Sequence, residues 1–109
     1  METAAIVLSV GQDLVEDFEE GFRRHELPIW QDFFARGIMV WASLQRMEIS
    51  SRPVEGAVQY LIVAVFATDE GHHEHDNDPR FQAWNERADV FQVAPALAFG
   101  GATILSVGR

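Results

Sequence analysis

Hydrophobic and polar residues follow one another along this chain with two different periods, and each change of period marks a predicted element. Short apolar runs predict strands at residues 4–10 and 57–68, and alternation at two-residue spacing predicts a strand at 38–49. Residues 96–107 are expected to form a last, glycine-containing strand. The strand at 57–68 has the strongest signal, because it is rich in Val, Ile, Tyr and Phe.

The alternation also predicts which side chains share a face of the second strand. One face is expected to carry Ile38, Val40, Ala42 and Leu44, and the other Met39, Trp41, Ser43 and Met47. The residues that follow, 50–56, contain a proline and are expected to form a loop.

Helical spacing separates the first two strands. Asp13 and Glu16 have the spacing of a capping box, and the apolar stripe that follows continues to Arg24. Residues 25–28 end in a proline, which disfavours helix at the residue before it, so we expect a bend there. A second helical piece is expected at 29–34.

A second helical region precedes the last strand. Asp78 and Pro79 form a good helix start, and Pro95 ends the pattern. The apolar stripe consists of Phe81, Trp84, Ala88 and Phe91. Residues 69–77 hold three of the four histidines and are expected to be a polar loop.

This order of strand, helix, strand, strand, helix and strand predicts an α+β fold of the ferredoxin-like kind. Right-handed crossovers place both helical regions on one face of a four-stranded antiparallel sheet. The chain, residues 1–109, has the length of a single domain.

The third strand is apolar on both of its faces, although the helices can cover only one. Tyr60, Ile62 and Phe66 alternate with Leu61, Val63 and Val65. A sheet with one solvated face alternates apolar with polar residues instead. The sequence therefore predicts that a second copy of the chain covers the other face, as a homodimer.

The segment His25-Glu26-Leu27-Pro28, followed by Gly37 and a strand, resembles a local pattern of the dimeric α+β barrel superfamily. Within it, the chain is similar to the EthD-like and antibiotic-biosynthesis-monooxygenase-like groups. EthD-like proteins often carry a His-Leu-Pro signature here; in this chain Glu26 interrupts it, and Arg36 stands where a proline is expected before Gly37.

The resemblance implies a dimer that pairs its sheets face to face and a small-molecule pocket between sheet and helices in each subunit. The superfamily includes cofactor-free monooxygenases, cyclases, lactone isomerases and haem enzymes. The fold alone therefore does not determine the function.

Composition excludes several kinds of chemistry. The net charge of −9 disfavours nucleic-acid partners, and all eight basic residues are arginine. Without lysine or cysteine there is no Schiff base, no thiolate zinc site and no cysteine nucleophile. The chain lacks a signal-peptide pattern and any apolar run near the ~20 residues of a membrane span, so we expect a cytoplasmic protein without a membrane partner.

His25 is the main catalytic candidate, because a histidine near a bend between helix and sheet can act as acid or base near neutral pH. A histidine that merely caps a helix end is the alternative. Tyr60 is the second catalytic candidate, since its hydroxyl needs a partner if buried. The neighbouring Glu26 is expected to be a solvated carboxylate.

Large aromatic side chains are the candidates for binding substrate, although each one also suits a core or an interface. They are Trp30, Trp41, Phe66 and Trp84. The cluster His72, His73 and His75 has metal-like spacing, but no rigid element is expected to hold it, so no metal and no cofactor are predicted.

Three functions remain open from the residues. The first is a cofactor-free enzyme of cyclase, isomerase or monooxygenase type, with His25 as acid or base on a small apolar or aromatic substrate. The second is a non-catalytic module that binds or senses a small ligand. The third is a metal- or haem-dependent protein that uses the histidines of residues 72–75 or His25.

Overall fold

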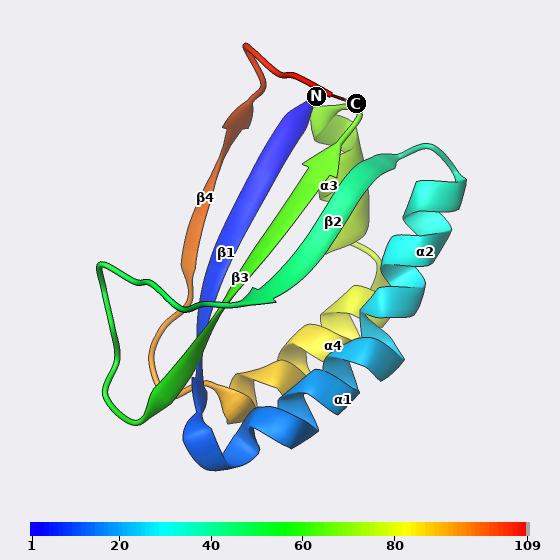
Figure 1. The fold of residues 1–109 in the computed structure, drawn as a ribbon. Coiled ribbons are helices and arrows are strands. Elements are labelled where there is room, and N and C mark those ends of the chain that lie inside the picture. The colour runs from blue at the N-terminus through cyan, green and yellow to red at the C-terminus, as the bar shows by residue number, and fades with distance from the viewer. Residues whose placement is uncertain (109) are drawn as a thin grey trace.

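Four strands form one antiparallel sheet in the order β2-β3-β1-β4, seen in the computed structural model of residues 1–108 (Figure 1). The strands are β1 (Glu2–Gly11), β2 (Met39–Arg46), β3 (Ala57–Phe66) and β4 (Leu97–Ala102). The two longest strands, β1 and β3, lie side by side in the centre, with Ile6 opposite Ile62. This is the predicted ferredoxin-like α+β fold.

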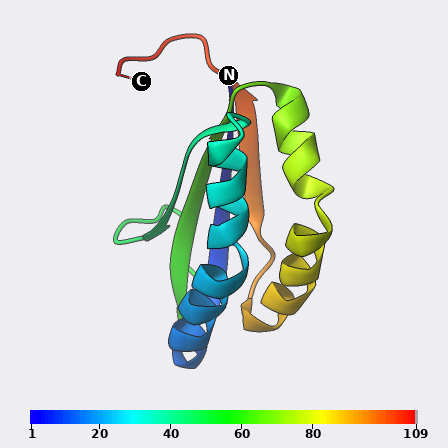
Figure 2. The same ribbon diagram turned by 90° about the vertical axis from the view of Figure 1, so that its right-hand side faces the viewer.

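The helices form a single layer on one face of the sheet (Figure 2). They are α1 (Val15–His25), α2 (Leu27–Ala35), α3 (Asp69–Asp76) and α4 (Pro79–Ala88), with 3-10 turns η1 (Gln12–Leu14) and η2 (Asp89–Phe91). The predicted bend falls at Glu26, whose amide still donates to the Phe22 carbonyl at 2.9 Å, so α2 follows α1 almost without interruption.

The core lies between the two layers. Phe18 is fully buried, and its ring lies 4.8 Å from that of Tyr60 on the sheet and 6.3 Å from that of Trp84 on α4. Aromatic rings at such distances add to the gain from apolar burial. They join the sheet, α1 and α4 into one packed interior.

The prediction that residues 69–77 form a loop is wrong, because most of them form α3. Thr68 caps this helix by accepting a hydrogen bond from the Gly71 amide. A side chain at Gly71 would meet Ile38 at 2.8 Å, so glycine lets α3 approach the start of β2 closely. The polar composition hid this helix, because only Gly71 and His75 are buried.

Three predicted strands end earlier than expected. The second stops at Arg46 and not at residue 49, the third at Phe66 and not at residue 68, and the fourth at Ala102 and not at residue 107. The pairing of β4 with β1 ends at Ala102 and Glu2, and the amide of Thr103 donates to the carbonyl of Met1 at 2.9 Å. Apolar composition without a partner strand does not make a strand.

The predicted face pattern of β2 is also corrected. The register shifts between Met39 and Trp41, so Met39 pairs with Phe66 on the helix-covered face. Met39 is accordingly buried together with the core, whereas the prediction placed it beside Trp41. A β-bulge changes the side on which later residues point, and alternation alone does not reveal it.

Candidate functional site

A cavity of about 100 Å³ lies between the sheet and the helices. Most of its wall is apolar. The sheet supplies Ala4, Ile6, Leu8, Ile62, Ala64 and Phe66, and the helices supply Phe18, Phe22, Trp30, Phe81, Trp84 and Ala88. Such a wall suits a small, largely apolar molecule.

A few polar side chains converge on this apolar wall. They are Glu26, His72, His75, Asp76, Asn85 and Gln92. Three of them, His72, His75 and Asp76, come from α3, the helix that pattern analysis missed. Polar groups in an otherwise apolar cavity orient a ligand and carry its chemistry.

Glu26 is the buried carboxylate of the site. It lies at the junction of α1 and α2, and only 3% of the residue is exposed. Its Oε1 accepts a hydrogen bond from Nε2 of His75 at 2.6 Å. Its Oε2 is buried and has no hydrogen-bond partner among residues 1–108. A buried carboxylate oxygen without a partner is costly, so this atom is the expected contact for a ligand.

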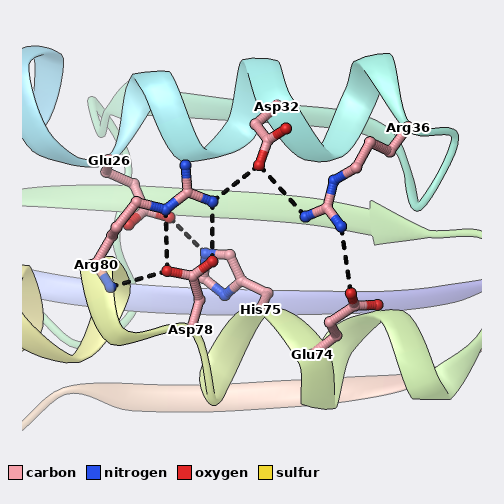
Figure 3. Close-up of polar contacts among 7 residues, drawn as sticks. All are labelled: Glu26, Asp32, Arg36, Glu74, His75, Asp78 and Arg80. Carbon is pink, nitrogen blue, oxygen red and sulfur yellow. Dashed lines mark hydrogen bonds and ion pairs between the residues drawn. The ribbon is translucent and has the colours of Figure 1, made fainter.

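His75 lies between two carboxylates. Its Nδ1 is 3.1 Å from Oδ1 of Asp76. Its Nε2 faces Glu26 (Figure 3). Burial by itself lowers the pKa of His75, but the hydrogen bonds to Asp76 and Glu26 outweigh it and raise the pKa to about 9. At neutral pH the ring is therefore an imidazolium that donates to both acids.

The polar chain continues from Asp76 to the edge of the fold. Oδ2 of Asp76 is 3.1 Å from Nε2 of His72, and Nδ1 of His72 is 2.7 Å from Oε1 of Glu2 on β1. The side chain of Asp76 is 47% exposed, in contrast to the 9% of His75. The chain thus leads from the cavity to solvent.

Ion pairs fasten α3 and α4 to α2 around this site (Figure 3). Arg80 donates to Asp32 at 2.9 Å and also to Asp78, the N-cap of α4. Arg36 bridges Asp32 and Glu74 at 3.3 and 3.4 Å. Exposed pairs contribute little singly, but a connected set holds the helix that carries His75 in register with Glu26.

Three of the four predicted substrate-binding residues line the cavity. Trp30 comes from α2, Phe66 from β3 and Trp84 from α4, and each is at least nine-tenths buried. Trp41 does not join them. It is 52% exposed and shares the uncovered face of the sheet with Val65.

His25 does not face the cavity, contrary to the expected orientation. It is half-buried at the end of α1, its ring is stacked on Trp84, and its Nε2 lies 3.1 Å from a guanidinium nitrogen of Arg87. Glu26, one residue later, turns into the interior instead. These contacts do not test the acid or base role predicted for His25, so that role stays a prediction.

Tyr60 is fully buried, as expected, and its hydroxyl has a partner. It donates to Oε2 of Glu19, which also accepts from Arg46. Burial, and then the bond to Glu19, raise the pKa of Tyr60 to about 12. These polar ends line an outer groove that does not include Glu26 or His75. The two predicted catalytic residues are therefore not brought together.

Solved structures of very different sequence share this fold. A candidate antibiotic biosynthesis monooxygenase from Nitrosomonas europaea superposes with a TM-score of 0.76 at 12% identity, over 98% of this chain and 93% of its own. One from Deinococcus radiodurans gives 0.71 at 14%, over 100% and 98%. A variant of SnoaB, a cofactor-independent oxygenase from Streptomyces nogalater, gives 0.66 at 16%, over 99% and 98%.

The chain shares the fold of these monooxygenase structures. At the level of the fold, this agrees with the resemblance to the antibiotic-biosynthesis-monooxygenase-like group, while the EthD-like group is not singled out. No family model and no curated protein matches the sequence.

The sequence did carry a signal for Glu26, but composition obscured it. Phe18, Phe22 and Glu26 are spaced by four, so Glu26 continues the buried stripe of α1. The expectation of a solvated carboxylate there is wrong. His75 shares a face with Gly71 by the same spacing, but only the recognition of α3 as a helix makes that visible.

The structure of residues 1–108 shows neither a metal-binding cluster nor a membrane-spanning helix. No group of three or more His, Cys, Asp or Glu side chains in that range is arranged to hold a metal ion. None of its helices has both the length and the apolar character required to cross a membrane.

Proposed function

We propose that this protein is a cofactor-free enzyme in which Glu26 removes a proton from a small, largely apolar carbonyl or phenolic molecule. The observation that carries the proposal is the unpartnered Oε2 of Glu26 in an apolar cavity, with Oε1 held by His75. This moves the proton-transfer role from His25 to the next residue.

The surroundings make Glu26 an effective base. An apolar wall withholds water from the carboxylate, and interactions between charges are stronger there than in water. The imidazolium of His75 keeps the pair neutral and orients the carboxylate. Trp30 and Trp84 supply flat apolar walls for a planar substrate.

The chemical step moves one proton. An acidic C–H or phenolic O–H of the substrate loses its proton to Oε2 of Glu26, and the electron pair stays on the substrate as an enolate or phenolate. That anion can be reprotonated at another atom, can cyclise, or can react with dioxygen as co-substrate. The description of SnoaB as a cofactor-independent oxygenase supports the cofactor-free reading.

A generic probe of a buried base tests the proposal without knowledge of the substrate. In 5-nitrobenzisoxazole, removal of the ring C–H proton breaks the N–O bond and releases a yellow cyanonitrophenolate. Wild type is expected to accelerate this ring opening, and Glu26→Gln to lower kcat by about two orders of magnitude with little change in KM. Glu20→Gln, on the exposed side of α1, is the matched control and should match wild type.

Tryptophan fluorescence separates catalysis from mere binding. Trp30 and Trp84 line the cavity, so a bound probe should alter their emission, and Trp41→Phe removes the exposed tryptophan from the signal. Tight binding without ring opening in wild type would contradict the enzyme and favour a ligand-binding module.

We propose in addition that the chain acts as a homodimer through the uncovered face of the sheet. This face presents Val7, Leu61, Val63, Val65, Trp41 and Phe99, which the strand register places on the side opposite the helices. Trp41 and Phe99 are 52% and 61% exposed in the single chain, and such a continuous apolar surface is typical of an interface.

Light scattering tests the dimer. Wild type should have the mass of two chains, and Val63→Lys, which places a charge in the middle of this face, should have the mass of one. Gln82→Lys on the exposed side of α4 is the control and should remain a dimer. A monomeric wild type would contradict the proposal.

A cytoplasmic location is proposed on the absence of cysteine, which suits a reducing compartment.

A further inference from the structure

We propose that Glu26, His75 and Asp76 couple proton uptake in the cavity to proton release at the surface. When the product anion has left the cavity and Glu26 still holds the proton taken from the substrate, His75 gives its Nδ1 proton to Asp76, and Asp76 passes it to solvent. This inference rests on the proposed role of Glu26 as the base, and it adds a role for α3.

The three groups form an unbroken line of contacts. Oε1 of Glu26 lies 2.6 Å from Nε2 of His75, and Nδ1 of His75 lies 3.1 Å from Oδ1 of Asp76. Exposure increases along the line, from 4% of the Glu26 side chain to 9% for His75 and 47% for Asp76. The inner end faces the cavity and the outer end meets water.

Among residues 1–108, Glu26 and Asp76 are the only charged side chains that make hydrogen bonds to His75. The remaining rings around it are Phe33 of α2, Phe66 of β3 and Phe81 of α4, and all three are apolar. Its hydrogen-bonded partners are the two acids, and these are the groups that raise its pKa. The protonation of His75 is therefore governed by Glu26 and Asp76.

Charge balance gives the coupling its direction. The resting pair is a carboxylate and an imidazolium, with no net charge in the interior. While the substrate anion stays in the cavity, it compensates the imidazolium. Once the anion has left, a proton on Glu26 leaves the imidazolium as an uncompensated buried cation, which is strongly unfavourable. Loss of the Nδ1 proton to Asp76 restores a neutral interior, made of a carboxylic acid and a neutral imidazole.

The proton count closes without another reactant. One proton enters at Oε2 of Glu26 and one leaves from Nδ1 of His75, and the Nε2 proton stays in its bond to Oε1. His72 extends the exit, because its Nε2 contacts Oδ2 of Asp76 and its Nδ1 contacts Glu2. When Glu26 then loses its proton to water in the emptied cavity, His75 is reprotonated by the same route, and the resting pair is restored.

Glu26→Gln imitates the protonated acid, so it tests the coupling in the protein alone. Carbon-13 NMR of labelled histidine rings, with the His75 signal assigned by His75→Gln, reports the charge of His75. Wild type should show an imidazolium at neutral pH. In Glu26→Gln the titration midpoint should fall by about 2 pH units or more, so that the ring becomes neutral. Glu20→Gln should leave the midpoint unchanged.

Asp76→Asn tests the transfer of the Nδ1 proton from His75 to Asp76, whose side chain is half-exposed. The His75 midpoint should fall here as well, and kcat for 5-nitrobenzisoxazole should drop about tenfold at unchanged KM. Glu70→Gln, an exposed carboxylate on the same helix, is the control and should change neither quantity. If Glu26→Gln fails to fold, a His75 midpoint that stays unchanged in Asp76→Asn overturns the coupling.

The two proposals fail in different ways. If Glu26→Gln abolishes ring opening while His75 remains an imidazolium at neutral pH, Glu26 is the base but the coupling is wrong. If the His75 midpoint falls as expected while wild type does not accelerate ring opening, the coupling stands and the catalytic role of Glu26 is wrong.

Discussion

Glu19 and Glu26 are two carboxylates of the same helical segment, seven residues apart, and the structure gives them opposite circumstances. Oε2 of Glu19 accepts from both Tyr60 and Arg46, and its side chain is 31% exposed. The hydrogen bonds from Arg46 and then Tyr60 lower the pKa of Glu19. Glu26 is buried against an apolar cavity with one oxygen unpaired.

The difference separates a structural acid from a candidate catalytic one. Glu19 is paired to fixed donors at the edge of the fold, so it has little to offer a ligand and serves to join α1 to β2 and β3. Glu26 has one fixed donor and one free oxygen. An incomplete hydrogen-bond set in a cavity, more than burial alone, is what marks a site.

The largest effect should come from comparing the two acids directly. Glu26→Gln is expected to lower kcat for 5-nitrobenzisoxazole by about two orders of magnitude, because an amide cannot accept the proton. Glu19→Gln should leave kcat within about a factor of two. Absorbance of the released phenolate measures both, and equal losses in the two variants would remove the distinction between them.

A smaller effect is expected on folding. The pKa of His75 is raised from 6.5 in the unfolded chain to about 9 in the folded one. Its contribution is therefore nearly complete below pH 6.5 and is lost as the pH rises through about 9, on the order of 3 kcal/mol of unfolding free energy. Urea unfolding at pH 6.5 and pH 9 measures the loss. His75→Gln should remove this part of the pH dependence, while Glu19→Gln should retain it.

The smallest effect is expected at Glu19, the acid at the edge of the fold. Tyr60→Phe removes the hydroxyl that donates to Glu19 but keeps the buried ring, and Glu19 retains Arg46. We expect a loss of about 1 kcal/mol in unfolding free energy, typical of one hydrogen bond, with ring opening unchanged. A clear loss of kcat in this variant would show that the outer groove takes part in catalysis.

Local pattern predicted the architecture well because the signals were local. The central strands and the helix begun by Pro79 follow from spacing and end signals a few residues apart. The capping box predicted at Asp13 and Glu16 does not form, because α1 begins after Leu14 without a side-chain cap. The same logic failed at α3, where a polar helix buries only Gly71 and His75 and so lacks an apolar stripe. It also failed at the bulge of β2 and at the end of β4, where pairing with other strands decides.

Local pattern also predicted some residues of the site and missed others. Large aromatics such as Trp30 and Trp84 were predicted as cavity walls because their size makes them core or pocket residues in almost any fold. The pairing of Glu26 with His75 joins residues 49 positions apart, and nothing local announces it. His25 and Glu26 are neighbours, yet helix geometry turns them in different directions.

The sequence by itself determined the order of the main elements, the acidic composition and the two apolar faces of β3, because these depend on composition and on short-range spacing. The tertiary structure alone decided which carboxylate faces the cavity and which histidine meets it. Those outcomes depend on how α3 packs against the α1–α2 junction, and they arise only when distant segments share one desolvated interior.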